Sequence, residues 1–236
     1  MKRYLPFIII ALVLVGAVVL ASMLWRRGTA GGDSNSTFAP TPDQPAPVAI
    51  TPVPTPAPVA MPTKPNFKVS SPVVLEEYGD YQCPPCGMLY PDLKKIEDEY
   101  GNQVQIVFHH FPLMKVHKNA LAAAHAAEAA RNQQKFWEMH DRLYRNQSAW
   151  ADQEDPRPIF ISYARELGLN VEQFRTDMES NQVDQRISAD IQRGASQGVT
   201  GTPTVFLDTH LLRYEATNAE GLRRGINLLL QGKPRS

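Results

Sequence analysis

The chain has two cysteines, Cys83 and Cys86, separated by the prolines Pro84 and Pro85. Thiols at this spacing can close into a disulfide and reopen, so the pair predicts redox chemistry. A cysteine at a helix N-terminus faces unpaired N–H groups and the positive end of the helix dipole, which favour the thiolate. We therefore expect Cys83 to be the nucleophile and Cys86 to resolve mixed disulfides. The two prolines suit a first helical turn but donate no N–H, which leaves the size of the pKa shift open.

Other uses of a cysteine pair fit less well. A structural zinc site usually takes four ligands, and there is no third cysteine. A c-type haem site needs a histidine after the second cysteine, where Gly87 stands. A purely structural disulfide this short would constrain the unfolded chain little. Copper(I) or zinc bound by the pair and a nearby histidine stays a weaker alternative. We expect no metal and no cofactor.

Residues 1–27 predict a transmembrane anchor or a signal segment. Basic residues flank an uncharged stretch, Phe7–Trp25, which as a helix would span roughly 28 Å, about the thickness of the hydrocarbon core. Small residues near Ala21 and Ala30 also allow a cleaved signal peptide. A retained anchor is favoured, and either alternative predicts an exported, extracytoplasmic domain, where thiol chemistry is useful.

Residues 28–66 predict a disordered, Pro-rich linker, with ten prolines between Pro40 and Pro65. Residues 67–236 are long enough for one globular domain with its own core. The chain has 24 basic and 24 acidic residues, a balance that argues against nucleic acid as a partner.

Apolar patterns place the cysteines between a strand and a helix, as in a thioredoxin-like βαβ unit. The fold class is therefore α/β: thioredoxin-like, with a large helical insertion between a βαβ half and a ββα half. We expect strands at 73–79, 104–108, 204–207 and 211–214. We expect helices at 83–100 and in the region 117–197, with Asn170 as an N-cap and Gly198 as the stop, and a final helix capped by Thr217.

Four blocks of sequence carry a family resemblance. The chain resembles the DsbA-like thiol–disulfide oxidoreductases, in particular the membrane-anchored thioredoxin-4 group. The blocks are VVLEEYGDYQCPPC (73–86), VFHHFPL (107–113), KFWEMHDRLYRNQ (135–147) and GVTGTPTVFLD (198–208). The resemblance covers residues 68–230 and implies protein disulfide oxidoreductase activity, with Cys83 exchanging disulfides with client proteins.

The resemblance also implies roles for residues far from the cysteines. Pro203 would follow a cis peptide bond, leaving the backbone of Thr202 to pair with a client strand. Glu77 would be a buried acid that accepts the Cys86 proton, whereas Glu76 would point to the other face of the strand. Independently of the resemblance, His109 and His110 end a strand near the active-site edge. Tuning of the thiolate is one use for them, but satisfaction by backbone or water is the favoured expectation.

The function implied by the resemblance is disulfide donation to exported proteins. A quinone-linked membrane partner of the DsbB or vitamin-K-epoxide-reductase (VKOR) type would then reoxidise the pair. An isomerase or reductase of the same fold is the alternative. Strongly oxidising relatives carry a histidine where this chain has Pro85, so we expect a milder oxidant.

Overall fold

The computed structural model describes residues 73–232. The expected anchor or signal segment (1–27) and linker (28–66) lie outside the described residues and stay predictions. Within residues 73–232, no helix is both long enough and apolar enough to cross a bilayer.

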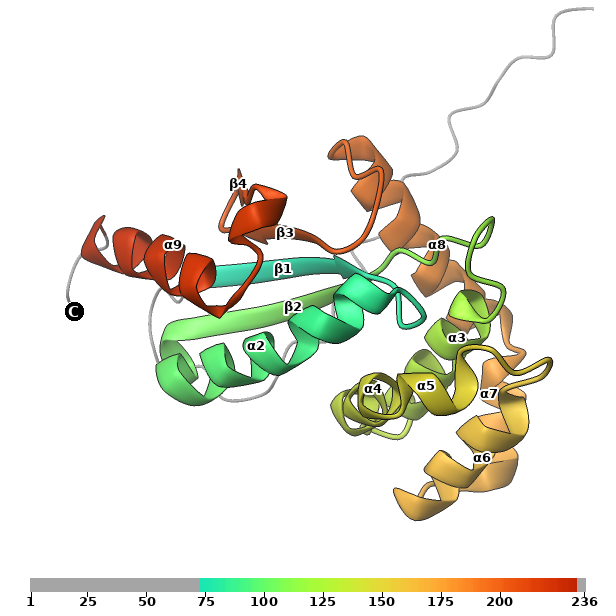
Figure 1. Cartoon of the computed structure of the whole chain (residues 1–236). Helices are drawn as coiled ribbons and strands as arrows, with labels where there is room; N and C mark the ends of the chain where they lie inside the picture. The colour runs from blue at the N-terminus through green and yellow to red at the C-terminus, as the bar shows by residue number, and fades with distance from the viewer. Residues whose placement is uncertain (1–72, 233–236) are drawn as a thin grey trace, which may run out of the picture. The chain divides into compact units, whose positions relative to one another are not determined.

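A four-stranded sheet with the order β2-β1-β3-β4 forms the centre of the domain (Figure 1). β1 pairs in parallel with β2 and antiparallel with β3, and β3 pairs antiparallel with β4. This is the thioredoxin-like α/β arrangement that the sequence predicts. The strands span Val73–Gly79 (β1), Val104–His110 (β2), Thr204–Leu207 (β3) and His210–Leu211 (β4).

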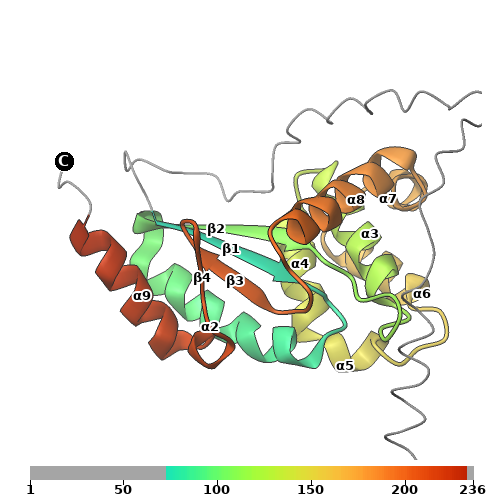
Figure 2. The same cartoon turned by 90° about the horizontal axis from the view of Figure 1, so that it is seen from above.

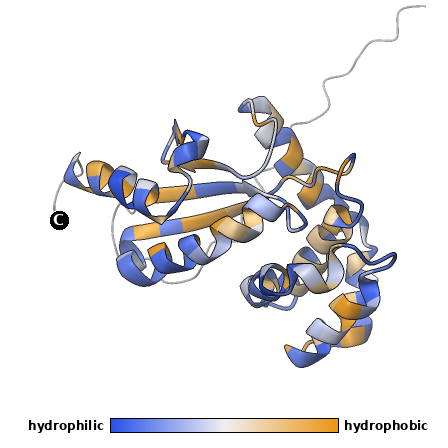
Figure 3. Ribbon diagram, in the orientation of Figure 1, coloured by the Kyte–Doolittle hydropathy of each residue, from blue (hydrophilic) through white to orange (hydrophobic). Residues whose placement is uncertain are grey.

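Two helices cover one face of the sheet: α2 (Pro84–Tyr100) and α9 (Ala219–Gly232). Side chains alternate along β1, so Val73 and Leu75 point to this face and are fully buried. They pack against an apolar stripe on each helix, including Ile96 of α2 and Ile226 of α9. Figure 3 shows apolar residues following the strands. This core holds the start of α2, and therefore the cysteine pair, against the end of β1.

Six helices separate β2 from β3, as the sequence predicts for this region. They gather at the end of the sheet where β1 and β2 finish (Figure 2). α3 presents buried alanines to α4 and α7, and such small side chains allow close packing. The helices span Ala120–Arg131 (α3), Phe136–Arg145 (α4), Gln147–Trp150 (α5), Arg157–Glu166 (α6), Val171–Met178 (α7) and Asn181–Ser196 (α8).

The last of these helices, α8, packs on the face of the sheet opposite α2. Its Gly194 lies so close to the ring of Tyr78 that a Cβ there would come within 2.9 Å of it. Tyr78 also stacks on His109 of β2, with ring centroids 4.5 Å apart. The end of β1 that leads to the cysteines is thus covered on both faces.

Two predicted caps are confirmed. Asn170 accepts a hydrogen bond from the Gln173 backbone at 3.0 Å at the start of α7, and Gly198, with φ of 81°, follows α8.

The predicted boundaries near the C-terminus were wrong in two places. The expected strand at 211–214 is only His210–Leu211, because both of its residues are exposed and the chain turns into a 3-10 helix, η2 (Tyr214–Ala216). The expected cap of the final helix, Thr217, instead donates its hydroxyl to the Tyr214 carbonyl. Asn218 takes the capping role, since its side-chain oxygen accepts from the Gly221 backbone at 3.1 Å.

Candidate active site

The two cysteines lie at the N-terminus of α2. Cys83 is the N-cap, with extended backbone angles, and Cys86 lies in the first turn. Both are free thiols; 4% of Cys83 is exposed and Cys86 is fully buried. The Cys83 thiol donates to the backbone carbonyl of Thr202 at 3.4 Å, and the Thr202–Pro203 peptide is cis, as expected. The structure therefore brings together the cysteine pair and the segment expected to bind clients.

The environment separates the two thiols. A hydrogen bond from the Cys86 side chain is the main cause that lowers the pKa of Cys83 to about 6, against the opposing effect of burial. The Thr202 side chain and the Cys86 backbone lower it further. Burial raises the pKa of Cys86 well above its usual value, and the adjacent Cys83 and Glu77 add to this. Near neutral pH these shifts favour the thiolate of Cys83 and the protonated thiol of Cys86.

Glu77 follows Val73 and Leu75 at every second position of β1, so it lies on the face covered by α2. Its partners in the neighbouring strands are Phe108 and Val205. Only 1% of Glu77 is exposed, and its Oε1 atom has no hydrogen-bond partner among residues 73–232. Burial, followed by the negative charge of Cys83, raises the pKa of Glu77 to about 8. A carboxyl of this pKa can both give up and take a proton near neutral pH.

Glu76 points to the opposite face, as expected. It forms an ion pair with Arg193 of α8 at 2.8 Å and contacts His109 at 3.3 Å. The hydrogen bond with His109 is the main cause that lowers the pKa of Glu76. Of the two neighbouring carboxyls, only Glu77 is electrostatically linked to the cysteines.

Asp80 organises the loop between β1 and Cys83. One carboxylate oxygen accepts from the Gln82 backbone at 2.7 Å, and the other accepts from the Leu113 backbone at 2.9 Å and lies 2.7 Å from His117 Nδ1. The Asp80 carbonyl also accepts from the Cys83 backbone at 3.1 Å. Asp80 thus ties the loop to the segment after β2, and its charge opposes the lowering of the Cys83 pKa.

The helical insertion holds the same loop from the other side. Gln147 Nε2 donates to the carbonyls of Tyr81 and Cys83, at 2.7 and 3.0 Å. The Gln82 side chain donates to the Ala151 carbonyl at 2.7 Å and accepts from the Asn119 backbone at 2.6 Å. The insertion therefore contacts the active-site loop directly.

The histidines are structural, but their expected partners were wrong. His109 contacts Asp190 at 3.3 Å in addition to Glu76, and His110 contacts Glu128 at 3.2 Å. The sequence predicts that the end of this strand is open to water. In the structure, α8 and α3 place the carboxylates of Asp190 and Glu128 against it. Among the described residues, no group of three or more His, Cys, Asp or Glu could hold a metal ion.

Exposed apolar side chains border the cysteine pair. A hollow of about 280 Å³ lies between Pro85, Pro203 and η2, and it is also lined by Met88 and Tyr214. These last two are 67% and 61% exposed. In the segment after β2 that Asp80 contacts, Met114 and Val116 are exposed as well. Such a surface suits an unfolded polypeptide.

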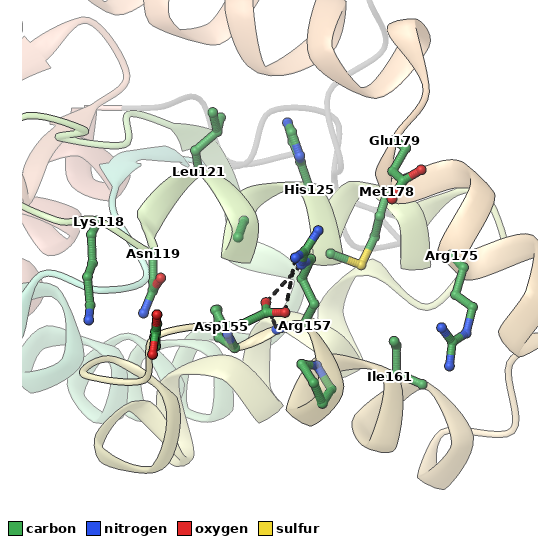
Figure 4. A pocket seen from close by; sticks show the side chains of 14 residues that line it. Lys118, Asn119, Leu121, His125, Asp155, Arg157, Ile161, Arg175, Met178 and Glu179 are labelled. Carbon is green, nitrogen blue, oxygen red and sulfur yellow. Dashed lines mark hydrogen bonds and ion pairs between the residues drawn. The ribbon is translucent and has the colours of Figure 1, made fainter.

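A larger cavity, of about 630 Å³, lies in the helical region between α3, α6 and α7 (Figure 4). Its lining mixes charges of both signs, including an ion pair between Asp155 and Arg157 at 2.8 Å. Neither cysteine lines it, so it is separate from the redox centre.

The family is decided by a match along most of the domain. The Thioredoxin_4 model, described as thioredoxin, matches residues 68–227. The chain belongs to the thioredoxin-4 family. It combines the fold of the DsbA-like thiol–disulfide oxidoreductases with a cysteine pair at the start of α2.

Solved structures share this thioredoxin-4 architecture at low sequence identity. BdbD from Bacillus subtilis has a TM-score of 0.63 at 21% identity, covering 72% of this chain and 93% of that one. The thiol-disulfide exchange protein α-DsbA2 from Wolbachia pipientis has a TM-score of 0.59 at 20% identity, covering 73% and 88%. At these identities the likeness shows the fold.

The curated relatives of this thioredoxin-4 chain are longer proteins, and the chain matches only a part of each. An Na⁺/H⁺ antiporter, NhaA 1 of Salinispora arenicola, is 38% identical over 163 residues, which cover 69% of this chain and 24% of that protein. NhaA 3 of Salinispora tropica is 38% identical over 139 residues, covering 58% and 20%. The chain thus spans about a quarter or less of the length of these relatives.

Sequence reasoning located the cysteines, Glu77, Thr202 and Pro203, and the structure places all of them at one site. It missed Asp80 and Gln147. Both lie in blocks that carry the family resemblance, at 73–86 and 135–147. A polar residue beside the cysteines was the available signal for Asp80, but nothing local showed what Gln147 would contact.

Proposed function

We propose that this protein is a thiol–disulfide oxidoreductase that donates disulfides to exported proteins. The separation of the two thiol pKa values supports this most directly. Stabilisation of the Cys83 thiolate favours the reduced pair, so the disulfide is readily passed to a client. Milder oxidation than in histidine-containing relatives stays our prediction for Pro85.

In the proposed reaction, a client thiolate attacks the Cys83 sulfur of the Cys83–Cys86 disulfide. A bond forms between the client and Cys83, and Cys86 leaves as a thiolate. A second client thiolate then attacks the client sulfur of the mixed disulfide, and Cys83 leaves as the stabilised thiolate. The client loses two electrons and the pair gains them.

Glu77 provides a proton route in this scheme. Cys86 leaves as a thiolate in a fully buried position, and because its pKa is raised, this thiolate is readily protonated. Protonated Glu77, with a pKa of about 8, supplies it, and the carboxylate takes it back when the pair is reoxidised.

Client proteins would bind at the apolar surface around the pair. Met88 and Tyr214 offer contacts beside the hollow that Pro85 lines, and Met114 and Val116 lie in the segment after β2 that Asp80 contacts. Exposed apolar side chains suit unfolded clients of varied sequence, and the carboxylates Asp92 and Glu215 also line the hollow.

The proposed location rests on the sequence of residues 1–27, and the proposed membrane partner rests on the family resemblance. We propose a single-pass anchor, an extracytoplasmic domain, and reoxidation by a quinone-linked membrane protein of the DsbB or VKOR type. The antiport activity named for the NhaA relatives is not proposed here, since the chain matches only a quarter of them.

The deciding experiment is a titration of the pair in glutathione buffers. A reduction potential of roughly −120 to −180 mV supports an oxidase or isomerase, whereas about −270 mV indicates a reductase that must receive electrons. Stoichiometric copper or zinc in the purified protein would favour the metal-handling alternative instead.

A further inference from the structure

The side chain of Gln147 bridges two carbonyl groups of the active-site loop. Its Nε2 atom donates to Tyr81 at 2.7 Å and to Cys83 at 3.0 Å. Gln147 begins α5 in the helical insertion, whereas the loop belongs to the thioredoxin unit. One amide therefore joins the insertion to the backbone of the nucleophilic cysteine.

The first turn of α2 has few other donors that could orient this backbone. Pro84 and Pro85 have no N–H. The Cys83 carbonyl accepts from the Gly87 backbone at 3.1 Å, so the Gly87 N–H and the Gln147 amide are the donors that hold it. These two donors restrain the Cys83 backbone, from which the sulfur extends toward Cys86.

Gly87 provides the space that the amide occupies. A Cβ at position 87 would lie 2.7 Å from Gln147 Oε1, closer than side-chain atoms normally approach. Glycine is a poor helix former, and α2 continues for thirteen residues beyond it. The close approach of Gln147 accounts for a glycine in this helix.

We propose that Gln147 is a positioning residue for the redox reaction, holding the Cys83 carbonyl so that the sulfur stays against Cys86 and Thr202. This inference rests on the proposed function, because it concerns the same thiol. Without the amide, the Tyr81 carbonyl loses a donor and the Cys83 carbonyl keeps only Gly87. The first turn then loosens, and the Cys83 thiolate loses part of its hydrogen bonding.

The test compares Gln147→Met, which keeps the length of the side chain but removes the amide, with Gln153→Met. Gln153 is exposed and donates to the Ala149 carbonyl at 3.2 Å, away from the loop. Two properties of the full-length protein are measured: the pH dependence of Cys83 alkylation by iodoacetamide, and the equilibrium constant with glutathione. A purely structural role would move neither.

For Gln147→Met, we expect the alkylation midpoint to rise by about half a pH unit or more. The glutathione equilibrium should move roughly threefold to tenfold toward the oxidised pair. Gln153→Met should match the wild type in both. A wild-type midpoint and equilibrium for Gln147→Met would overturn the inference.

Gly87→Ala supplies an independent variant, in case Gln147→Met folds poorly. Its added methyl should displace the amide and raise the alkylation midpoint in the wild-type background. In a Gln147→Ala background the methyl has room, so Gly87→Ala should cause no further change. Additive shifts in the two backgrounds would contradict the inference. A wild-type pair that does not exchange with glutathione would refute the proposed function, while the alkylation profiles would still decide the role of Gln147.

Discussion

The thiol of Cys83 lies 3.4 Å from the backbone carbonyl of Thr202, a residue 119 positions further along the chain. This contact joins the two halves of the thioredoxin unit at the reactive sulfur. The carbonyl accepts a hydrogen bond from the thiol but has no hydrogen to donate to the thiolate. Stabilisation of the thiolate therefore depends chiefly on Cys86.

Replacing Cys86 tests that dependence. Cys86→Ala removes the side-chain donor that contributes most to the low pKa, so the pKa of Cys83 should rise from about 6 toward its ordinary value. Cys86→Ser keeps a donor and should retain most of the shift. The rate of iodoacetamide alkylation between pH 4 and 9 measures both. Equal midpoints for the two variants would contradict this assignment.

Glu77→Gln tests the buried carboxyl. The folded pKa of about 8 lies above the ordinary carboxyl value of 4.5, so this group contributes stability that is fully present below pH 4.5 and is lost as the pH rises toward 8. At pH 7 the variant should therefore be more stable, by roughly 1–3 kcal/mol in free energy of unfolding, and this gain should vanish near pH 4. Urea denaturation at both pH values is the measurement.

Glu76→Gln is the matched control for Glu77. The pKa of Glu76 is lowered by His109, with a further contribution from Arg193, so its loss should not stabilise the protein at pH 7.

In catalysis, Glu77→Gln should slow the step in which Cys86 reacts. Stopped-flow measurement of disulfide reduction gives the rate of this step. Unchanged kinetics would remove Glu77 from the proton route.

Glu128→Gln should destabilise the join between β2 and α3. Glu128 is 1% exposed and is bound by Arg186 and His110. Burial is the largest single influence and raises its pKa, but the hydrogen bond and charge of His110 together with the charges of Arg131 and Arg186 outweigh it and lower the pKa to about 2. We expect a loss of about 3 kcal/mol at pH 7, because the variant leaves Arg186 buried without its anion.

The pH dependence of that loss has a defined sign. A lowered pKa stabilises the folded state above pH 4.5, and this contribution disappears as the pH falls toward 2. The difference between wild type and Glu128→Gln in urea melts should therefore shrink below pH 4.5 and close only near pH 2. The control is Glu138→Gln, whose exposed ion pair with Lys135 should contribute under about 0.5 kcal/mol.

Pro85→His tests the expected effect of the residue between the cysteines. A histidine adds a donor and a positive charge near the Cys83 sulfur, so the glutathione equilibrium should move toward the reduced pair by roughly threefold to tenfold. Pro85→Ala restores the backbone N–H without the imidazole and separates the two contributions. No shift in the histidine variant would refute the role given to Pro85.

Much of the site was predictable because its signals are local. The strand before Cys83 and the helix after it follow from residues within about twenty positions, and the four family blocks placed Thr202 and Glu77. Strand alternation alone could not choose Glu77 over Glu76, since that choice depends on which helix covers which face. The resemblance supplied it.

The polar supports of the site could not be predicted, because their partners are distant in sequence. Asp80 contacts residues 33 and 37 positions away, and Gln147 contacts carbonyls 64 and 66 positions away. Composition and periodicity carry no information on such contacts. The error at 211–214 has a similar origin, because the short pairing of this run with β3 and its turn into η2 depend on contacts that the local sequence does not show.

The position of the helical insertion also sets the order in which the protein can fold. β1 pairs with β3, and α2, β2 and the whole helical insertion lie between these two strands in the chain. Such non-local pairing forms slowly, because a long loop must close first. During synthesis the N-terminal part of the chain is made first, so β1, α2 and both cysteines are present before β3. Until the insertion has folded and β3 has joined β1, Cys83 has no Thr202 beside it and is open to reaction with any nearby disulfide.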